Sequence, residues 1–195
     1  HDAGARLVVQ LTAGMGRQAG VADPSHPPVA PSAVPAFFNP AVLCRPLTVD
    51  EIHALVEDFG NAARRVLLAG ADGIEIHGHT GYLIDQFLSP LWNKRTDEYG
   101  GDFACRTRLL LEVVDAVRAV WPATKPLFVR LSATEWLEGG WGVEDSVRLA
   151  GLLADRGVDF MDVSSAGNVL ARIPTDPGYQ VPLARAVRAA GLPTG

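Results

Sequence analysis

Four short runs of apolar and β-branched residues stand out along the chain, at 6–11, 73–76, 127–131 and 159–163. Each run is nearly continuous in hydrophobicity and too short for a typical helix. This is the pattern of parallel strands that are covered on both faces. We therefore predict four strands in a parallel sheet.

Segments with helical periodicity lie between these runs. In 50–69 the apolar residues recur at i, i+3, i+4 and i+7, which places them on one face of a helix. Thr48 and Glu51 have the spacing of a capping box at its start, and Gly70 is a suitable end. The same reasoning predicts helices at 106–120, 144–156 and 182–190.

The alternation of strands and helices predicts an α/β fold with a parallel sheet. Periodicity alone does not decide between an open, doubly wound sheet and a barrel. A complete (β/α)8 barrel has eight strands and typically about 250 residues, whereas this chain has 195 residues and shows four strands and the start of a fifth. If the fold is a barrel, we expect residues 1–195 to form its central part, incomplete at both ends.

Composition excludes several classes of partner. The net charge of −5 gives no basic footprint for nucleic acid or for an anionic membrane. No apolar run approaches the roughly 18 residues of a membrane span. Cys44 and Cys105 lie far apart and outside any metal-ligand spacing, so reduced thiols in the cytoplasm are the simplest interpretation.

Candidate chemistry collects where the predicted strands end, which is where parallel barrels carry their functional groups. The segment 77–82 follows the second strand and holds two imidazoles and one phenol within six residues. These groups can supply hydrogen-bond donors and a proton. A single buried histidine is as often a satisfied polar group, but three such side chains in one segment favour a functional site.

The stretch Glu75–Gly101 closely resembles the longest signature of the Old Yellow Enzyme family. Shorter pieces follow in the order that this family shows, and the likeness runs from about residue 8 to 195. These pieces are Gln10-Leu, Gly16-Arg17, Pro31-Ser-Ala33, Arg45-Pro-Leu-Thr48 and Val129-Arg-Leu-Ser132. The resemblance implies a partial TIM (β/α)8 barrel that contains about strands three to six and the start of strand seven.

The resemblance also implies an activity. Enzymes of this family are FMN-dependent NAD(P)H oxidoreductases, and the ene-reductases among them pass a hydride from flavin N5 to an activated C=C bond. Matching positions make Tyr82 the proton donor and His77 a hydrogen-bond donor to the substrate oxygen. Gln10 and Arg130 match positions that bind the pyrimidine edge of FMN, where a fixed cation favours the reduced flavin. A phenol is protonated at neutral pH, as a general acid must be.

One position departs from the family pattern. The family places a second histidine or an asparagine three residues after the first, and here that residue is Thr80. The second imidazole, His79, stands one position earlier and need not face the same way as His77. Thr80 can donate through its hydroxyl over a shorter reach. Either residue could be the second donor to the substrate oxygen.

The segment 10–17 resembles the subgroup of large enoate and dienoyl reductases, which often carry an iron–sulfur cluster and a further flavin domain. This chain has no cysteine cluster, so an iron–sulfur cluster could lie only in a C-terminal part beyond it. The family's FMN-phosphate site forms after strands seven and eight. We therefore expect weak or absent FMN binding by these 195 residues alone. The expected partners are a small activated alkene and, for a homo-oligomer, further copies of the chain.

Two other interpretations remain open. His77 and His79 have the HxH spacing with which metal-dependent hydrolase barrels hold a divalent ion, although the further ligands expected at later strand ends are missing. The chain could also be an inactive half-barrel whose exposed strand edges favour association.

Overall fold

The structure is a computed structural model that describes residues 3–20 and 23–195. Its centre is a parallel sheet with the strand order β1-β4-β5-β6. These strands are β1 (Val8–Leu11), β4 (Gly73–Gly78), β5 (Leu127–Ser132) and β6 (Phe160–Ser164). The four strands predicted from the sequence are confirmed, with ends that differ by one or two residues.

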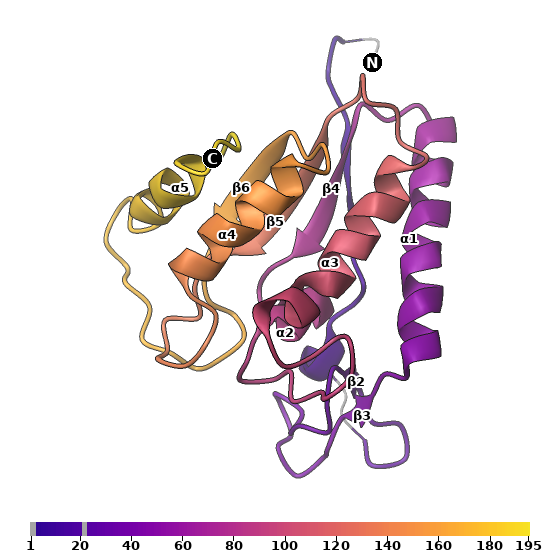
Figure 1. Ribbon diagram of the computed structural model, residues 1–195. Coiled ribbons are helices and arrows are strands. Elements are labelled where there is room, and N and C mark those ends of the chain that lie inside the picture. Colours follow the sequence, from indigo (N-terminus) through magenta and orange to yellow (C-terminus); the bar gives the residue numbers. More distant parts are fainter. Residues whose placement is uncertain (1–2, 21–22) are drawn as a thin grey trace.

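Helices cover one side of this sheet (Figure 1). The longer ones are α1 (Val49–Leu68), α3 (Phe103–Arg118), α4 (Val143–Ala154) and α5 (Val181–Arg188). The predicted capping box starts α1, since the Thr48 hydroxyl accepts the N–H of Glu51 at 3.2 Å and the Glu51 carboxylate accepts the N–H of Thr48 at 2.9 Å. The helix α3 begins three residues before its predicted start because Asp102 caps it, accepting the N–H of Cys105 at 2.9 Å.

One short helix, α2 (Leu83–Leu88), is missing from the sequence-based prediction. All six of its residues are buried, so the helix has no solvent-exposed face and shows no amphipathic repeat. It follows β4 after a turn of four residues and packs mainly against α3. The segment 77–82 therefore contains the end of β4 and the turn that leads into α2.

The strands carry two different sets of side chains. The first set, which we call the helix-facing side, is completely buried: Ile74, Ile76, Leu127, Val129, Leu131 and Met161. The second set alternates with it along each strand and includes polar and charged groups. We call this second set the open face: Val8, Gln10, Glu75, His77, Phe128, Arg130, Phe160 and Asp162. A cavity of about 370 Å³ lies against this face, and six of its residues line that cavity.

The placement of the helices decides between the two sheet architectures. A doubly wound sheet carries helices on both faces, whereas a barrel wall carries them on the outside only. Within the described residues the helices lie on one face. The next strand also begins at the edge of β6, where Thr194 bridges Met161 in parallel and the N–H of Val163 donates to the carbonyl of Gly195 at 2.8 Å. The prediction of a partial TIM barrel is confirmed.

A long excursion between β1 and α1 forms a second, smaller cluster. It contains the short parallel pair β2 (Val29–Ala30) and β3 (Arg45–Pro46) and a few buried side chains, among them Val34 and Cys44. The Pro-rich segment is thus an ordered part of the structure. No helix within residues 3–20 and 23–195 has the length and hydropathy needed to cross a membrane.

Candidate active site

The turn between β4 and α2 is built from strained backbone. Thr80 has φ of 60° and Gly81 has φ of 70°, a left-handed conformation that is costly for a β-branched residue such as threonine. Two hydrogen bonds hold it: the N–H of Thr80 donates to Ser132 Oγ at 3.0 Å, and the N–H of Gly81 donates to Asp85 Oδ2 at 2.7 Å. A strained turn that is fixed by its surroundings is typical of a functional site.

This turn brings three aromatic rings together. The rings of His77 and Tyr82 stack with centroids 4.9 Å apart and an interplanar angle of 25°. The ring of His79 lies on His77, with centroids 4.2 Å apart. On a continuous strand His77 and Tyr82 would point to opposite faces, so their contact depends on the turn. The structure therefore places the predicted proton donor beside the predicted oxygen-binding histidine.

The two candidates for the second donor are placed differently. His79 is buried against His77, whereas Thr80 is exposed. The Thr80 hydroxyl is hydrogen-bonded to Nδ1 of His79. The geometry thus puts an imidazole, supported by Thr80, next to His77. Which of these two residues acts on a substrate stays a prediction.

The electrostatics keep both imidazoles neutral at neutral pH. Burial lowers the pKa of His77, and the charge of Arg130 lowers it further. Burial, His77 and Arg130 together lower the pKa of His79 to about 3. A neutral imidazole has one N–H donor and one acceptor. Nδ1 of His77 is buried without a hydrogen-bond partner, so this ring retains unused hydrogen-bonding capacity.

Arg130 lies directly beside His77 on the open face. The two residues pair in register across β4 and β5, and Arg130 in turn pairs with Asp162 on β6. Arg130 Nε and Asp162 Oδ2 form an ion pair at 3.2 Å, with both side chains about one third exposed. The sequence prediction gave Asp162 no role, although its place in the same two-residue period as Arg130 could have indicated this pairing.

Gln10 occupies the same face on β1. Its Nε2 donates to Glu75 Oε1 at 2.6 Å, and the two residues are partners in register. The open face therefore carries a row of polar groups that runs from Gln10 through His77 to Arg130. The partly exposed side chain of Arg130 and the unpartnered Nδ1 of His77 fit a polar, planar ligand such as the flavin ring.

A network of side-chain amides holds the turn from the other side. Gln18 Nε2 donates to the carbonyl oxygens of Thr80 (2.9 Å), Gly81 (3.0 Å) and Gly167 (2.7 Å). Gln86 Nε2 donates to the carbonyl of Gly81 at 2.6 Å. The sequence analysis did not identify these residues. The one available signal was a pair of polar residues, Asp85 and Gln86, inside the otherwise apolar helix α2.

The turn also meets the loop after β6 at very short range. A Cβ added to Gly167 would lie 2.5 Å from the Cα of Thr80, and one added to Gly81 would lie 2.4 Å from the carbonyl oxygen of Gly167. Ser132 joins the same two loops, because its hydroxyl accepts from Thr80 and donates to the carbonyl of Ala166 at 2.8 Å. Only glycine permits this backbone-to-backbone contact.

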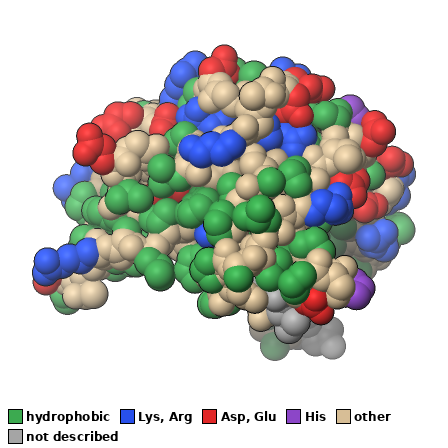
Figure 2. All heavy atoms as spheres, turned by 90° about the horizontal axis from the view of Figure 1, so that it is seen from below, with side chains coloured by type: hydrophobic (Ala, Val, Ile, Leu, Met, Phe, Trp, Pro, Cys, Tyr) green, Lys and Arg blue, Asp and Glu red, His purple; other side chains and the backbone are tan. Residues whose placement is uncertain are grey.

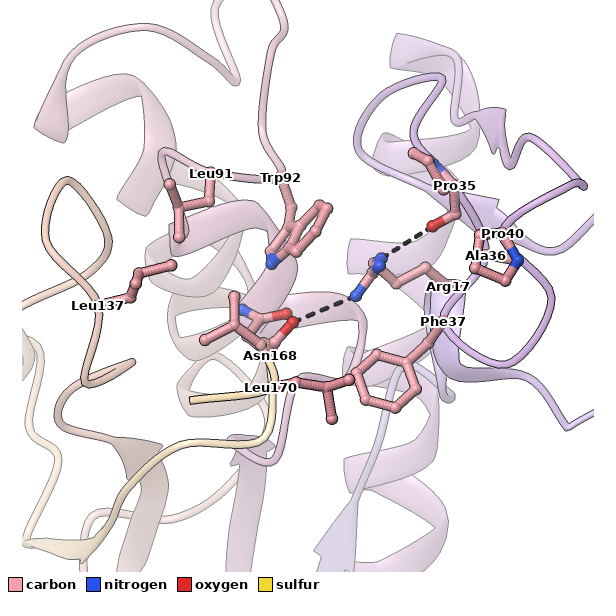
Figure 3. A pocket seen from close by; sticks show the side chains of 11 residues that line it. Arg17, Pro35, Ala36, Phe37, Pro40, Leu91, Trp92, Leu137, Asn168 and Leu170 are labelled. Atoms are coloured by element: carbon pink, nitrogen blue, oxygen red, sulfur yellow. Dashed lines mark hydrogen bonds between the residues drawn. The ribbon is translucent and has the colours of Figure 1, made fainter. Parts of the chain in front are cut away.

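A second cavity, of about 480 Å³, opens beside this loop and is shown in Figure 3. Most of its lining is apolar, and Figure 2 shows hydrophobic side chains gathered over this end of the molecule. The Arg17 side chain stacks on the Trp92 ring, 3.6 Å from its centroid, and donates to the carbonyls of Pro35 and Asn168 at 3.1 Å each. Because Arg17 is only 5% exposed, it joins these segments structurally.

The described residues offer little support for a metal site. Within 3–20 and 23–195, no group of three His, Cys, Asp or Glu side chains could hold a metal ion. Among these described residues, His77 and His79 therefore have no third protein ligand of the kind that the hydrolase interpretation needs.

Comparison with known proteins agrees with this geometry. Residues 1–184 match the NADH:flavin oxidoreductase / NADH oxidase family. The chain is 45% identical over 196 residues to an NADPH dehydrogenase from Halalkalibacterium halodurans. The matched region covers 100% of this chain and 56% of that protein. The chain spans about half the length of the curated relatives that it matches.

Solved structures show the same relationship. Morphinone reductase is 31% identical, with a TM-score of 0.76 over 97% of this chain and 54% of that one. The old yellow enzyme homologue from Zymomonas mobilis is 29% identical, with a TM-score of 0.73 over 100% of this chain and 63% of that one. The resemblance noted from the signature stretch is confirmed. The chain belongs to the NADH:flavin oxidoreductase / NADH oxidase family, the family of Old Yellow Enzyme.

Proposed function

We propose that this chain is the central part of an FMN-dependent ene-reductase, an enzyme that uses NAD(P)H to reduce a C=C bond conjugated to a carbonyl group. The observation that carries the proposal is the stacking of Tyr82 on His77 at the end of β4, with Arg130 beside His77 in register. A phenol, a neutral imidazole and a cation at one strand end match what this reaction requires.

The open face supplies the residues that would hold the flavin. Arg130 would place its positive charge at the pyrimidine edge of the ring, and Gln10 would offer its side-chain amide there. Bound FMN supplies the hydride that the alkene accepts. The anionic phosphate of FMN needs further donors. We propose that these lie outside this chain, so that the isolated 195 residues bind FMN weakly or not at all.

The three-ring cluster would then act on the substrate. His77, held neutral by burial and by Arg130, would donate its N–H to the carbonyl oxygen and stabilise the negative charge that develops there. Tyr82 would give its hydroxyl proton to the carbon next to the carbonyl. His79 is the second candidate donor to the oxygen, and Thr80 would orient it through their hydrogen bond.

A chimera tests the proposal directly. This chain would replace the matching half of the Halalkalibacterium halodurans NADPH dehydrogenase, which aligns with it over its full length. We expect the chimera to retain FMN through gel filtration and to reduce a cyclic enone with NADPH. Tyr82→Phe should lower the rate of enone reduction by about 100-fold or more while NADPH still reduces the flavin, because proton transfer by a positioned acid typically contributes about 10²–10⁴-fold.

Tyr99→Phe is the matched control. Tyr99 is buried and donates to Glu112 at 2.7 Å, away from the ring cluster, so its replacement should leave enone reduction unchanged. A folded chimera that takes up no FMN would overturn the proposed function. A chimera that reduces enones equally well with Tyr82→Phe would overturn the role of Tyr82 alone.

The alternative of an inactive half-barrel predicts a different result, namely that the chain supports neither flavin uptake nor reduction in the chimera. The choice of NADH or NADPH, a homo-oligomeric state and a cytoplasmic location stay predictions. Cys44 is buried and Cys105 is half-buried, both as free thiols, which agrees with a reducing compartment.

A further inference from the structure

Asp85 is a buried carboxyl group that the proposed chemistry does not use. It lies in the first turn of α2 and is 1% exposed. Its Oδ2 accepts the N–H of Gly81 at 2.7 Å, whereas its Oδ1 has no hydrogen-bond partner. Gly81 directly precedes Tyr82. The carboxyl group therefore fixes the backbone of Gly81, the residue of the turn that leads directly into Tyr82.

Two other acceptor oxygens without partners belong to the same buried cluster. They are Oε1 of Glu135 and Oδ1 of Asn168, and both residues are 0% exposed. Asn168 lies against Asp85, since its Nδ2 donates to the backbone carbonyl of Asp85 at 3.2 Å. Acceptor oxygens cannot satisfy one another. A carboxyl group can supply the missing donor only in its protonated form.

The neighbouring charges indicate which carboxyl group keeps the proton. The 3-10 helix η1 (Gly16–Gln18) contributes Arg17 and α3 contributes Arg106, and both cations interact electrostatically with Glu135. Burial raises the pKa of Glu135 as well, but the N–H of Trp141, which donates to Glu135 Oε2 at 2.7 Å, and the charge of Arg106 oppose this rise. Burial raises the pKa of Asp85 well above its ordinary value, and the negative charge of Glu135 raises it further, while the N–H of Gly81 and the neighbouring Ser132 hydroxyl oppose this rise.

The remaining elements packed against α2 do not change this balance. The strand β2 has no titratable side chain. The titratable side chains of β4, Glu75 and His77, belong to the open face, on the opposite side of the strand from Ile74 and Ile76.

We propose that Asp85 is a carboxylic acid in the folded protein, that it donates its proton toward Glu135 and Asn168, and that it is a positioning residue for Tyr82. In this form one oxygen accepts from Gly81 while the other donates, a combination that a carboxylate cannot provide. The proposal does not rest on the flavin assignment, because every contact that it uses lies within this chain.

Infrared spectroscopy of the purified 195-residue chain tests the protonation state. At neutral pH the wild type should show the carbonyl stretch of a protonated carboxylic acid, and Asp85→Asn should lack that band. Glu135→Gln should keep it, because the proton resides on Asp85. An absent band in the wild type, or a band that survives Asp85→Asn and vanishes in Glu135→Gln, would overturn the assignment.

The pH dependence of unfolding gives a second readout. A carboxyl group whose pKa is raised on folding binds more protons in the native state, so its contribution to stability falls as pH rises above the ordinary aspartate value of about 3.9. Asp85→Asn cannot lose a proton. The melting temperature of Asp85→Asn, relative to that of the wild type, should therefore rise from pH 4 to pH 8. The two melting temperatures should be most similar near pH 4.

Asp102→Asn is the matched control with the opposite sign. Asp102 caps α3, and its hydrogen bond from the N–H of Cys105 lowers its pKa. The advantage of the wild type over this variant should grow as pH rises. If Asp85→Asn behaved in the same direction as Asp102→Asn, Asp85 would be ionised in the folded protein and the proposal would be wrong.

Tyrosine-labelled NMR separates positioning from a general effect on stability. The Tyr82 ring resonance, shifted by stacking on His77 and assigned with Tyr82→Phe, should keep its position in Asp85→Asn and move in Asp85→Ala, which releases Gly81. Rescue by asparagine but not by alanine supports the proposal. Equal movement in both variants, or in neither, would overturn the positioning role.

Discussion

The two sides of the sheet use the same strands for different purposes. On the helix-facing side, alternate residues such as Val129 and Leu131 are completely buried beneath the helices. Between them on the open face lies Arg130, whose side chain is 38% exposed and is paired to another partly exposed side chain, Asp162. The comparison shows that a two-residue period separates buried apolar side chains from partly exposed polar ones within one strand.

A similar contrast distinguishes the strands from the turn that follows β4. The strands have regular backbone and pair in register with their neighbours. The turn contains left-handed Thr80 and Gly81 and depends on contacts with Ser132, Asp85 and Gln18. Strained backbone is located where the rings of His77, His79 and Tyr82 meet, and the surrounding network stabilises it.

The largest effect on stability should come from the helix-facing side. Leu131→Ala removes a completely buried side chain and should lower the free energy of unfolding by about 2–5 kcal/mol, the range for such truncations. Arg130→Met, one position away on the open face, should lower it by less than about 1 kcal/mol, the usual limit for an exposed ion pair. Urea unfolding of both variants checks the contrast, and equal losses would show that the open face is also structural.

The next effect concerns the contact between the two loops. Gly167→Ala should destabilise the protein by about 1–3 kcal/mol, because its Cβ would collide with Thr80 and because φ at this position is 102°. Gly151→Ala is the control, since a Cβ there meets nothing within 4 Å and alanine favours the helix α4. Thermal unfolding compares them. A neutral Gly167→Ala would mean that the loop after β6 shifts freely away from the turn.

Much of the fold could be predicted from the sequence because burial leaves a pattern in the chain. The longer helices follow from their helical period, the four strands follow from short, nearly continuous apolar runs, and the capping box at Thr48 and Glu51 indicated the start of α1. The helix α2 was missed because every one of its residues is buried, which leaves no period to detect. A helical period identifies only those helices that have one buried and one exposed face.

The site was predictable only in part. The rule that parallel barrels place chemistry at strand ends identifies His77 and Tyr82, and the family resemblance suggests their roles. The buried network was missed because its contacts join residues far apart in sequence, such as Asn168 and Asp85, which are separated by 83 positions. The choice of His79 over Thr80 as the neighbour of His77 also required the turn geometry, which no pattern in the sequence specifies.

The smallest effect at neutral pH, and one that grows in acid, should come from His79. Its pKa of about 3 in the folded protein lies below the ordinary histidine value of about 6.5. Between these two pH values the imidazole is therefore protonated in the unfolded chain and neutral in the native state. Stability from this source is complete above pH 6.5 and is lost as pH falls toward 3. In His79→Asn the melting temperature should therefore fall less between pH 7 and pH 4 than in the wild type, although His77 keeps part of the dependence.

Thr80→Ala is the control, because it removes the hydroxyl bonded to His79 but leaves the imidazole that titrates. An acid profile for His79→Asn that matches the wild type would show that this ring is protonated where it lies, and that the end of the open face is more hydrated than its burial indicates.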